Sequence, residues 1–157
     1  MNSTDISHLA SKLLNDVQSA IEKEVFKICE KALKDAIMET VYSGSPGTYT
    51  RTMEFLRAVR VDKVSVGRTQ ATFEIIVDAT MMGMKPPSGG KWGSHTSFSG
   101  QDVREELVGW LNDGTSNKYH SHPAHKFFDR AEDGLDNKIV KAMASSLSAN
   151  GWEVTYI

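Results

Sequence analysis

The sequence reads LVGWLNDGT over residues 107–115 and HPAHKFFDRA over residues 122–131, with a short polar run between them. An apolar segment therefore ends on Asn-Asp-Gly-Thr, and Pro123 is placed to open a new helix led by two phenylalanines. Two interpretations are open. One is a metal site, because three histidines fall within six residues. The other, which we favour, is a structural corner that docks the second half of a small α+β domain.

The metal interpretation rests on His120-Ser121-His122-Pro123-Ala124-His125. This stretch resembles the His-x-His-x-Asp-His zinc motif of metallo-β-lactamase-like hydrolases, in which the first two histidines bind one zinc and the aspartate and last histidine bind a second. Ala124 stands at the aspartate position, and residues 115–119 are not an apolar core strand. The prediction is therefore no metal and no cofactor, with His120, His122 and His125 as the ligands of the alternative, a zinc-dependent hydrolase.

The composition indicates one soluble domain spanning residues 1–157, with 39% apolar and 24% charged residues. A net charge of −2 gives no electrostatic reason to expect nucleic acid or an anionic membrane as a partner. No apolar run approaches the ~18 residues of a spanning helix, and the N-terminus is polar, so we expect a cytoplasm-like compartment. The single cysteine, Cys29, is expected to be a buried small hydrophobe.

Residues 5–42 are predicted to form one long helix, because apolar residues recur at steps of three and four until the turn sequence SGSPG at 43–47. At ~1.5 Å per residue the helix is about 55 Å long, beyond the diameter of a small domain. One alternative is a helix that wraps along one large core or is kinked into two pieces. The other is a helix that packs against copies of itself or a neighbouring protein.

Residues 53–80 are predicted to form an antiparallel β-hairpin, since two β-branched runs flank a turn at Gly67-Arg68-Thr69-Gln70. Residues 81–101 are rich in glycine and have no usable period. We expect an extended loop that orders against a partner; the alternative is a loop folded over its own domain. The residues expected to make the partner contact are the loop's apolar ones, Met82, Met84, Trp92 and Phe98.

The remaining elements are expected to be a short helix at 102–112, a helix at 123–150 and a terminal strand at 152–157. Helices and strands are segregated along the chain, which is typical of an α+β fold. The predicted architecture is a long N-terminal helix and a C-terminal helix packed on a small antiparallel β-sheet, with a long protruding loop.

Three stretches give the chain a resemblance to a known family: YTRTMEFLRA at 49–58, LNDGT at 111–115 and PAHKFFDRA at 123–131. They are similar to the Tyr-x-Arg-Thr-x-x-Leu element, the acidic-Gly-Thr ending and the Pro-Ala-Arg-x-Phe-x-x-x-Ala helix start of the head–tail joining or tail-completion (neck) proteins of long-tailed bacteriophages. The order and spacing also match over most of residues 1–150. His125 stands where that family carries arginine, which puts a charged contact there in doubt.

The resemblance implies a non-enzymatic virion protein, made in the host cytoplasm, that forms a homo-oligomeric ring at the head–tail junction beside other connector and tail proteins. It also implies no cofactor. From the net charge and the lack of a long apolar run, we expect no membrane and no sequence-specific nucleic acid as partners. The alternatives are the zinc-dependent hydrolase and a small partner-binding protein, such as a member of a toxin–antitoxin pair.

Overall fold

The computed structural model describes residues 3–44, 53–67, 70–83, 104–116 and 121–155. In chain order the elements are α1 (Ser3–Ala20), the π-helical turn η1 (Ile21–Val25), α2 (Phe26–Thr40), α3 (Glu54–Arg57), β1 (Val59–Val66), β2 (Ala71–Val77), the 3-10 turn η2 (Ala79–Met81), α4 (Arg104–Asp113), β3 (Thr115–Ser116), β4 (Ser121–His122), α5 (Phe127–Glu132) and α6 (Leu135–Ala149).

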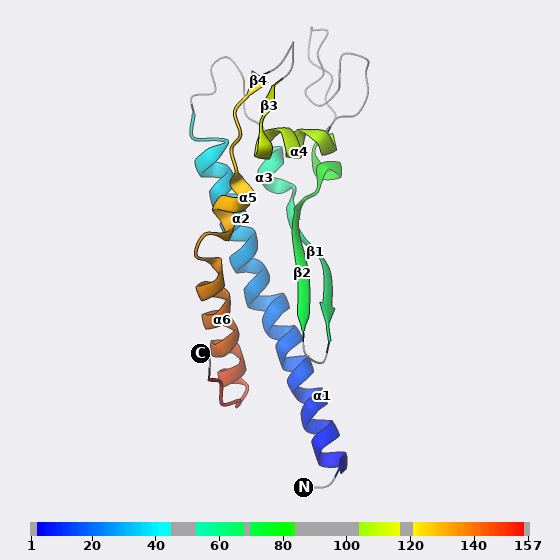
Figure 1. The fold of residues 1–157 in the computed structure, drawn as a ribbon. Helices are drawn as coiled ribbons and strands as arrows, with labels where there is room; N and C mark the ends of the chain where they lie inside the picture. Colours follow the sequence, from blue (N-terminus) through cyan, green and yellow to red (C-terminus); the bar gives the residue numbers. More distant parts are fainter. Residues whose placement is uncertain (1–2, 45–52, 68–69, 84–103, 117–120, 156–157) are drawn as a thin grey trace.

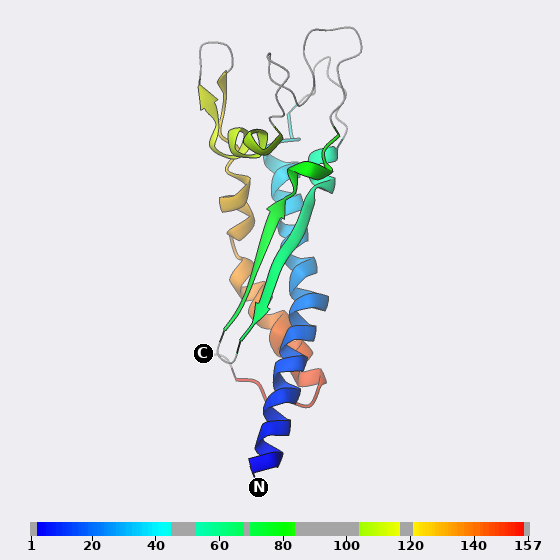
Figure 2. The same ribbon diagram turned by 90° about the vertical axis from the view of Figure 1, so that its right-hand side faces the viewer.

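The molecule is elongated along one helical rod, in which α1, η1 and α2 follow one another without a break (Figure 1). The β1–β2 hairpin lies along one side of this rod, and α5 and α6 lie along another (Figures 1 and 2). α4 crosses the end of the hairpin, and α1 extends past the hairpin and α6 at the opposite end. The predicted α+β class, with a long N-terminal helix and a small antiparallel sheet, is confirmed.

The π-helical turn η1 helps to keep the buried face of the long helix aligned as the chain passes from α1 into α2. Buried residues recur at every fourth position from η1 into α2: Ile21, Val25, Cys29, Leu33 and Ile37. At 3.6 residues per turn each step of four overshoots a full turn by about 40°, so a face that continues at steps of four drifts gradually around a regular helix. The Phe26 N–H donates to the Ile21 carbonyl, five residues back. This wider turn absorbs part of the overshoot and keeps the two halves in register.

The hairpin forms as predicted, with Val59 opposite Val77 and a register irregularity between Asp62 and Ser65. One face packs against the rod, where the Phe73 and Phe26 ring centroids are 5.5 Å apart. The hairpin is preceded by the short helix α3, so the first residues of the predicted 53–80 hairpin are helical.

The core lies where the hairpin, α2 and α5 meet. Its fully buried side chains include Leu33, Ile37 and Phe127. Cys29 is 1% exposed, as expected of a buried small hydrophobe, and burial raises the pKa of its thiol to about 11.

The predicted helix at 123–150 is wrong in two respects. Residues 123–126 have no regular structure, so the helix begins at Phe127 rather than at the proline. It is also broken into α5 and α6 at Asp133 and Gly134, where Gly134 has a φ of 68°. Only a glycine adopts this left-handed conformation without a steric penalty, so the chain can turn here and start a new helix.

The predicted terminal strand at 152–157 is also wrong over the described residues 152–155, which have no regular structure. The chain instead returns to the long helix. The Trp152 indole Nε1–H donates to the Asp16 carboxylate at 2.8 Å, and the Lys12 ammonium lies 5.4 Å from the Trp152 ring centroid.

Candidate functional site

The segment between α4 and α5 is a corner in which the free backbone groups at the end of α4 and at the start of α5 find hydrogen-bond partners. The last carbonyls of α4 accept hydrogen bonds from the segment that precedes α5. The His125 N–H donates to the Leu111 carbonyl at 3.0 Å, and the Lys126 N–H donates to the Asn112 carbonyl at 2.9 Å. The Asn112 side-chain oxygen accepts from the Phe128 N–H, in the first turn of α5, at 3.2 Å. Helix ends otherwise leave such groups without partners. The geometry therefore supports the corner interpretation of this stretch.

Packing and charge reinforce the corner. Phe127 is 0% exposed and meets Phe55 edge-on, with ring centroids 5.5 Å apart. The Lys126 ammonium lies 2.8 Å from the Asp113 carboxylate, and this hydrogen bond lowers the pKa of Asp113 and raises the pKa of Lys126. Both groups are exposed, so solvent screening keeps the contribution of the pair to stability small.

A second ion pair joins α5 to the long helix. The Arg130 guanidinium donates to both carboxylate oxygens of Glu39, at 2.9 and 3.2 Å. The two-pronged geometry fixes the orientation of α5 on α2 more firmly than a single contact would.

The histidine cluster is only partly within the described residues. His125 is half-buried and its backbone serves the corner. His120 lies outside the described residues, as does His95, and the structure describes only the backbone of His122. Within the described ranges no group of three or more histidine, cysteine or acidic side chains is arranged to hold a metal ion.

Of the predicted partner-binding loop at 81–101, the structure describes only residues 81–83, and Met81 belongs to the turn η2. Met82 is 1% exposed and packs in the core with Leu33 and Phe127, so its assignment to an exposed contact surface is wrong. The Arg104 guanidinium on α4 holds this segment, donating to the Met82 carbonyl at 2.7 Å and to the Thr80 carbonyl at 3.3 Å. The other three predicted contact residues, Met84, Trp92 and Phe98, lie outside the described residues.

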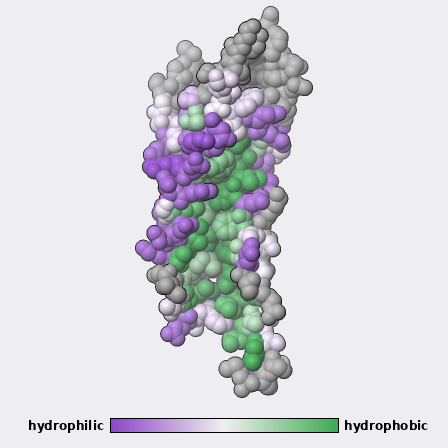
Figure 3. Space-filling model, in the orientation of Figure 1, coloured by the Kyte–Doolittle hydropathy of each residue, from purple (hydrophilic) through white to green (hydrophobic). Residues whose placement is uncertain are grey.

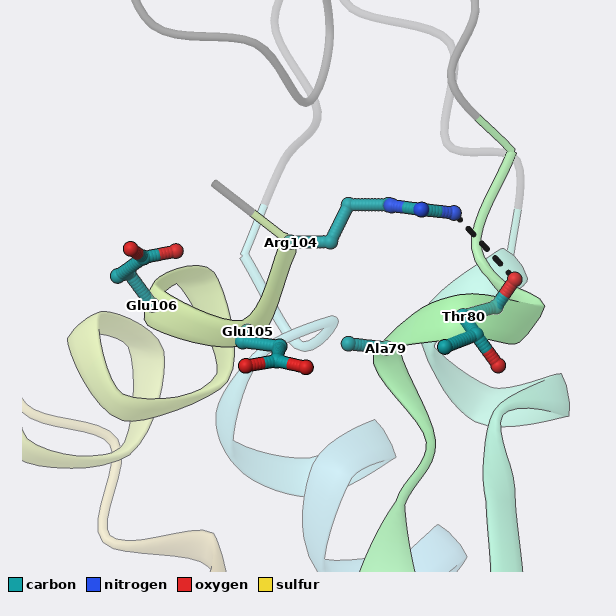
Figure 4. Close-up of a pocket in the computed structure, with 5 residues that line it drawn as sticks. All are labelled: Ala79, Thr80, Arg104, Glu105 and Glu106. Carbon is teal, nitrogen blue, oxygen red and sulfur yellow. Dashed lines mark hydrogen bonds between the residues drawn. The ribbon is translucent and has the colours of Figure 1, made fainter. Parts of the chain in front are cut away.

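A hollow of about 240 Å³ lies beside this tether, lined by Ala79, Thr80, Arg104, Glu105 and Glu106 (Figure 4). The Arg104 side chain reaches across it to Thr80, Glu105 extends toward Ala79, and Glu106 lies on the far side of α4. Among the described residues that line the hollow, Arg104 is the cation, and it is already bonded to two carbonyls. Its observed role is therefore to tie α4 to the segment that follows β2.

An exposed apolar stripe on α1 is the first of two apolar surface features. Ile6, Leu9 and Leu13 are 56%, 47% and 38% exposed, and their spacing of three and four residues puts them on one face of the helix. The same face continues to Ala20, which is 1% exposed. Cover from the C-terminal segment reaches α1 at Asp16 and Lys12, where Trp152 lies beside the stripe and leaves these three side chains exposed. The face that is core further along the rod is therefore open to solvent over residues 6–13; we call these three side chains the α1 stripe.

A groove bounded by β2, α4 and α5 is the second feature. It has a volume of about 400 Å³ and a mostly apolar lining: Ile75, Ile76, Val77, Ala79, Val108 and Phe128, with Asp78, Thr80 and Glu105 adding polar groups. The Asp78 carboxylate is held by Thr80 and by Arg60 at 2.8 Å, and these bonds lower its pKa. We call this feature the β2–α4–α5 groove.

The space-filling view shows how apolar side chains are distributed over one face of the molecule. Apolar side chains gather in a band on the face between the hairpin and the α5–α6 side, and the band reaches down toward α1 (Figure 3). Hydrophilic residues border it on the α5–α6 side. Contiguous apolar surface of this kind on a folded protein marks an interaction site more often than a solvated face.

Comparison with known protein families assigns the chain to one of them. The family model YomN matches residues 5–149, which is nearly the whole chain. The chain belongs to the YomN family. YomN is a phage-derived family, so this is a phage-related protein, in agreement with the broader part of the resemblance found in the sequence. Neither the curated proteins nor the solved structures gave a significant match.

Among the described helices, none combines the length and the apolar character that crossing a bilayer requires.

Of the two surface features, the sequence pattern predicts only the α1 stripe, and only in part. The stripe belongs to the apolar periodicity of the long helix, but periodicity does not say which turns are covered. The groove was missed, because its lining comes from three separate segments and only the fold brings Ile76, Val108 and Phe128 together.

Proposed function

We propose that this YomN-family protein is a non-enzymatic structural component of the virion of a long-tailed phage. It forms a homo-oligomeric ring at the head–tail junction, where it contacts other connector and tail proteins. Membership of a phage-derived family supports the setting. The resemblance of residues 49–58, 111–115 and 123–131 to neck proteins supports the position.

The observation that supports a role in assembly is the exposed α1 stripe, which lies on the part of the long helix that extends beyond the hairpin and α6. Leaving three large aliphatic side chains in water at helical spacing forgoes roughly 25 cal/mol for each Å² that could be buried. A neighbouring subunit that covers the stripe recovers this free energy, whereas an isolated subunit does not.

Quantitative mass spectrometry of purified phage particles tests the position. The expected result is a small ring-like number of copies per particle, near six or twelve by closed symmetry. Absence of the chain from particles that are otherwise complete would overturn the proposal.

Size measurement of the purified protein, by light scattering across a concentration series, tests the assembly role. The wild type should form a discrete oligomer, and Leu9→Asp should shift it toward the monomer. Ser11→Asp is the matched control, because Ser11 is exposed on the opposite side of α1. Unchanged oligomers in the Leu9 variant would show that the α1 stripe is not a subunit contact.

A further inference from the structure

We infer that the α1 stripe of one copy docks into the β2–α4–α5 groove of the next copy of the same chain. The inference rests on the proposed homo-oligomer and names the two surfaces that build it. Both surfaces are present on every subunit, and the described structure leaves both open to solvent.

The two surfaces match in chemistry. An amphipathic helix binds an apolar groove through side chains at positions i, i+3, i+4 and i+7, and the stripe offers Ile6, Leu9 and Leu13 at i, i+3 and i+7. The groove offers an apolar floor that includes Ile76, Val108 and Phe128, with polar groups at its edge.

They also match in size. A large aliphatic side chain occupies on the order of 100 Å³, since each of its carbons takes up nearly as much room as a water molecule, roughly 30 Å³. The groove volume of about 400 Å³ therefore accommodates the three side chains of the stripe together.

A subunit cannot fill its own groove with its own stripe. The ion pair of Arg130 with Glu39 places α5, and with it the groove, near the far end of α2. Thirty-three residues of helix separate Ile6 from Glu39, which is about 50 Å at ~1.5 Å per residue. Both elements are fixed to the same continuous rod, so only another copy can bring the stripe to the groove.

The arrangement has consequences for the assembly. Stripe and groove are different surfaces near opposite ends of the molecule, so the contact is heterologous, and such contacts close into rings when the rotation permits. Three half-exposed aliphatic side chains and the groove wall facing them bury roughly 600 Å², about half of what a stable pair of proteins needs. One contact alone is weak. Closure gives each subunit two contacts and stabilises the whole ring.

Mixing two complementary variants is the sharpest test. Leu9→Asp spoils the stripe and keeps the groove, whereas Val108→Asp spoils the groove and keeps the stripe. Each variant alone should be monomeric. An equimolar mixture should form pairs of subunits, because the intact stripe of the Val108 variant meets the intact groove of the Leu9 variant. Each pair has only one intact contact and cannot close into a ring, so the mixture is measured at protein concentrations well above those at which the wild type assembles. A mixture that stays monomeric even at these high concentrations, from two variants with native circular dichroism, would overturn the inference.

Photo-crosslinking covers the case in which Val108→Asp does not fold. A photoreactive benzoylphenylalanine at position 9 in the otherwise wild-type protein should crosslink to residues 75–80, 104–111 or 128. Mixing isotopically heavy and light protein should show that the crosslink joins two copies. The same group at position 11 is the control and should not reach the groove.

The outcomes separate the inference from the proposed function. Oligomers whose position 9 crosslinks outside the groove would overturn the stripe–groove contact while leaving the ring intact. A protein that is monomeric in solution and absent from phage particles would overturn both.

Discussion

Replacing Phe127 by alanine should be among the most destabilising single changes in the described part of the chain. The side chain is 0% exposed and lies where α5 meets α2 and α3, edge-on to Phe55 and 4.7 Å from Phe128 between ring centroids. Burying a phenylalanine removes roughly 200 Å² from water, which at ~25 cal/mol per Å² is about 5 kcal/mol as an upper estimate. Truncating such a side chain typically costs about 3–5 kcal/mol.

A loss of that size is a large fraction of the ~5–15 kcal/mol that stabilises a natural domain. The assay is equilibrium denaturation in urea, with hydrogen exchange to locate the effect. The free energy of unfolding should fall by about 3–5 kcal/mol, and amides of α4 and α5 should lose protection first. Phe128→Ala, at a half-buried neighbour, is the control and should cost about 1–2 kcal/mol. A Phe127 variant no less stable than the Phe128 variant would refute the claim that Phe127 docks the corner.

Two further predictions concern the long helix. Deleting Lys23 from the π turn should leave the free energy of unfolding within about 1 kcal/mol of wild type, because the shortened segment becomes a regular helix with the same buried face; inserting one alanine after Lys31 should be far more damaging, since it rotates Leu33 and Ile37 by about 100°. Denaturation of both variants checks this, and a deletion as harmful as the insertion would contradict the register argument. For Cys29, the unfolded thiol ionises near its ordinary pKa of 9.0, while burial raises the folded pKa to about 11. Stability present below pH 9 should therefore fall between pH 9 and about 11 relative to Cys29→Ala, and equal pH slopes for the two proteins would argue against this.

The sequence pattern predicts an element correctly where the residues that determine its structure lie within the same segment. The steps of three and four over residues 5–42 predict a helix whether or not its partners are known, because an apolar face at that period suits only one regular structure. The hairpin at Gly67 follows in the same way from two β-branched runs and a turn. Cys29 on the apolar stripe is buried as its neighbours predict.

The elements that the sequence pattern predicts wrongly are those whose structure depends on residues far away along the chain. Met82 opens a glycine-rich stretch that predicts a loop, but its side chain belongs to the core cluster with Leu33 and Phe127. Trp152 alternates with its neighbours as a strand would, yet it pairs with Asp16 on the long helix, 136 residues away. The apolar steps after Pro123 continue across Gly134, so periodicity alone does not reveal the break between α5 and α6.

By itself the sequence determined the α+β class, the long helix and the Asn-Asp-Gly-Thr corner, because periodicity, β-branching and turn chemistry act between residues close along the chain. Only the tertiary structure decided which parts of the apolar face are covered. Ala20 and Leu13 belong to one stripe, but the first is buried and the second exposed, since the cover from the C-terminal half ends near Trp152. The groove is likewise a product of the fold, because β2, α4 and α5 create it only where they meet.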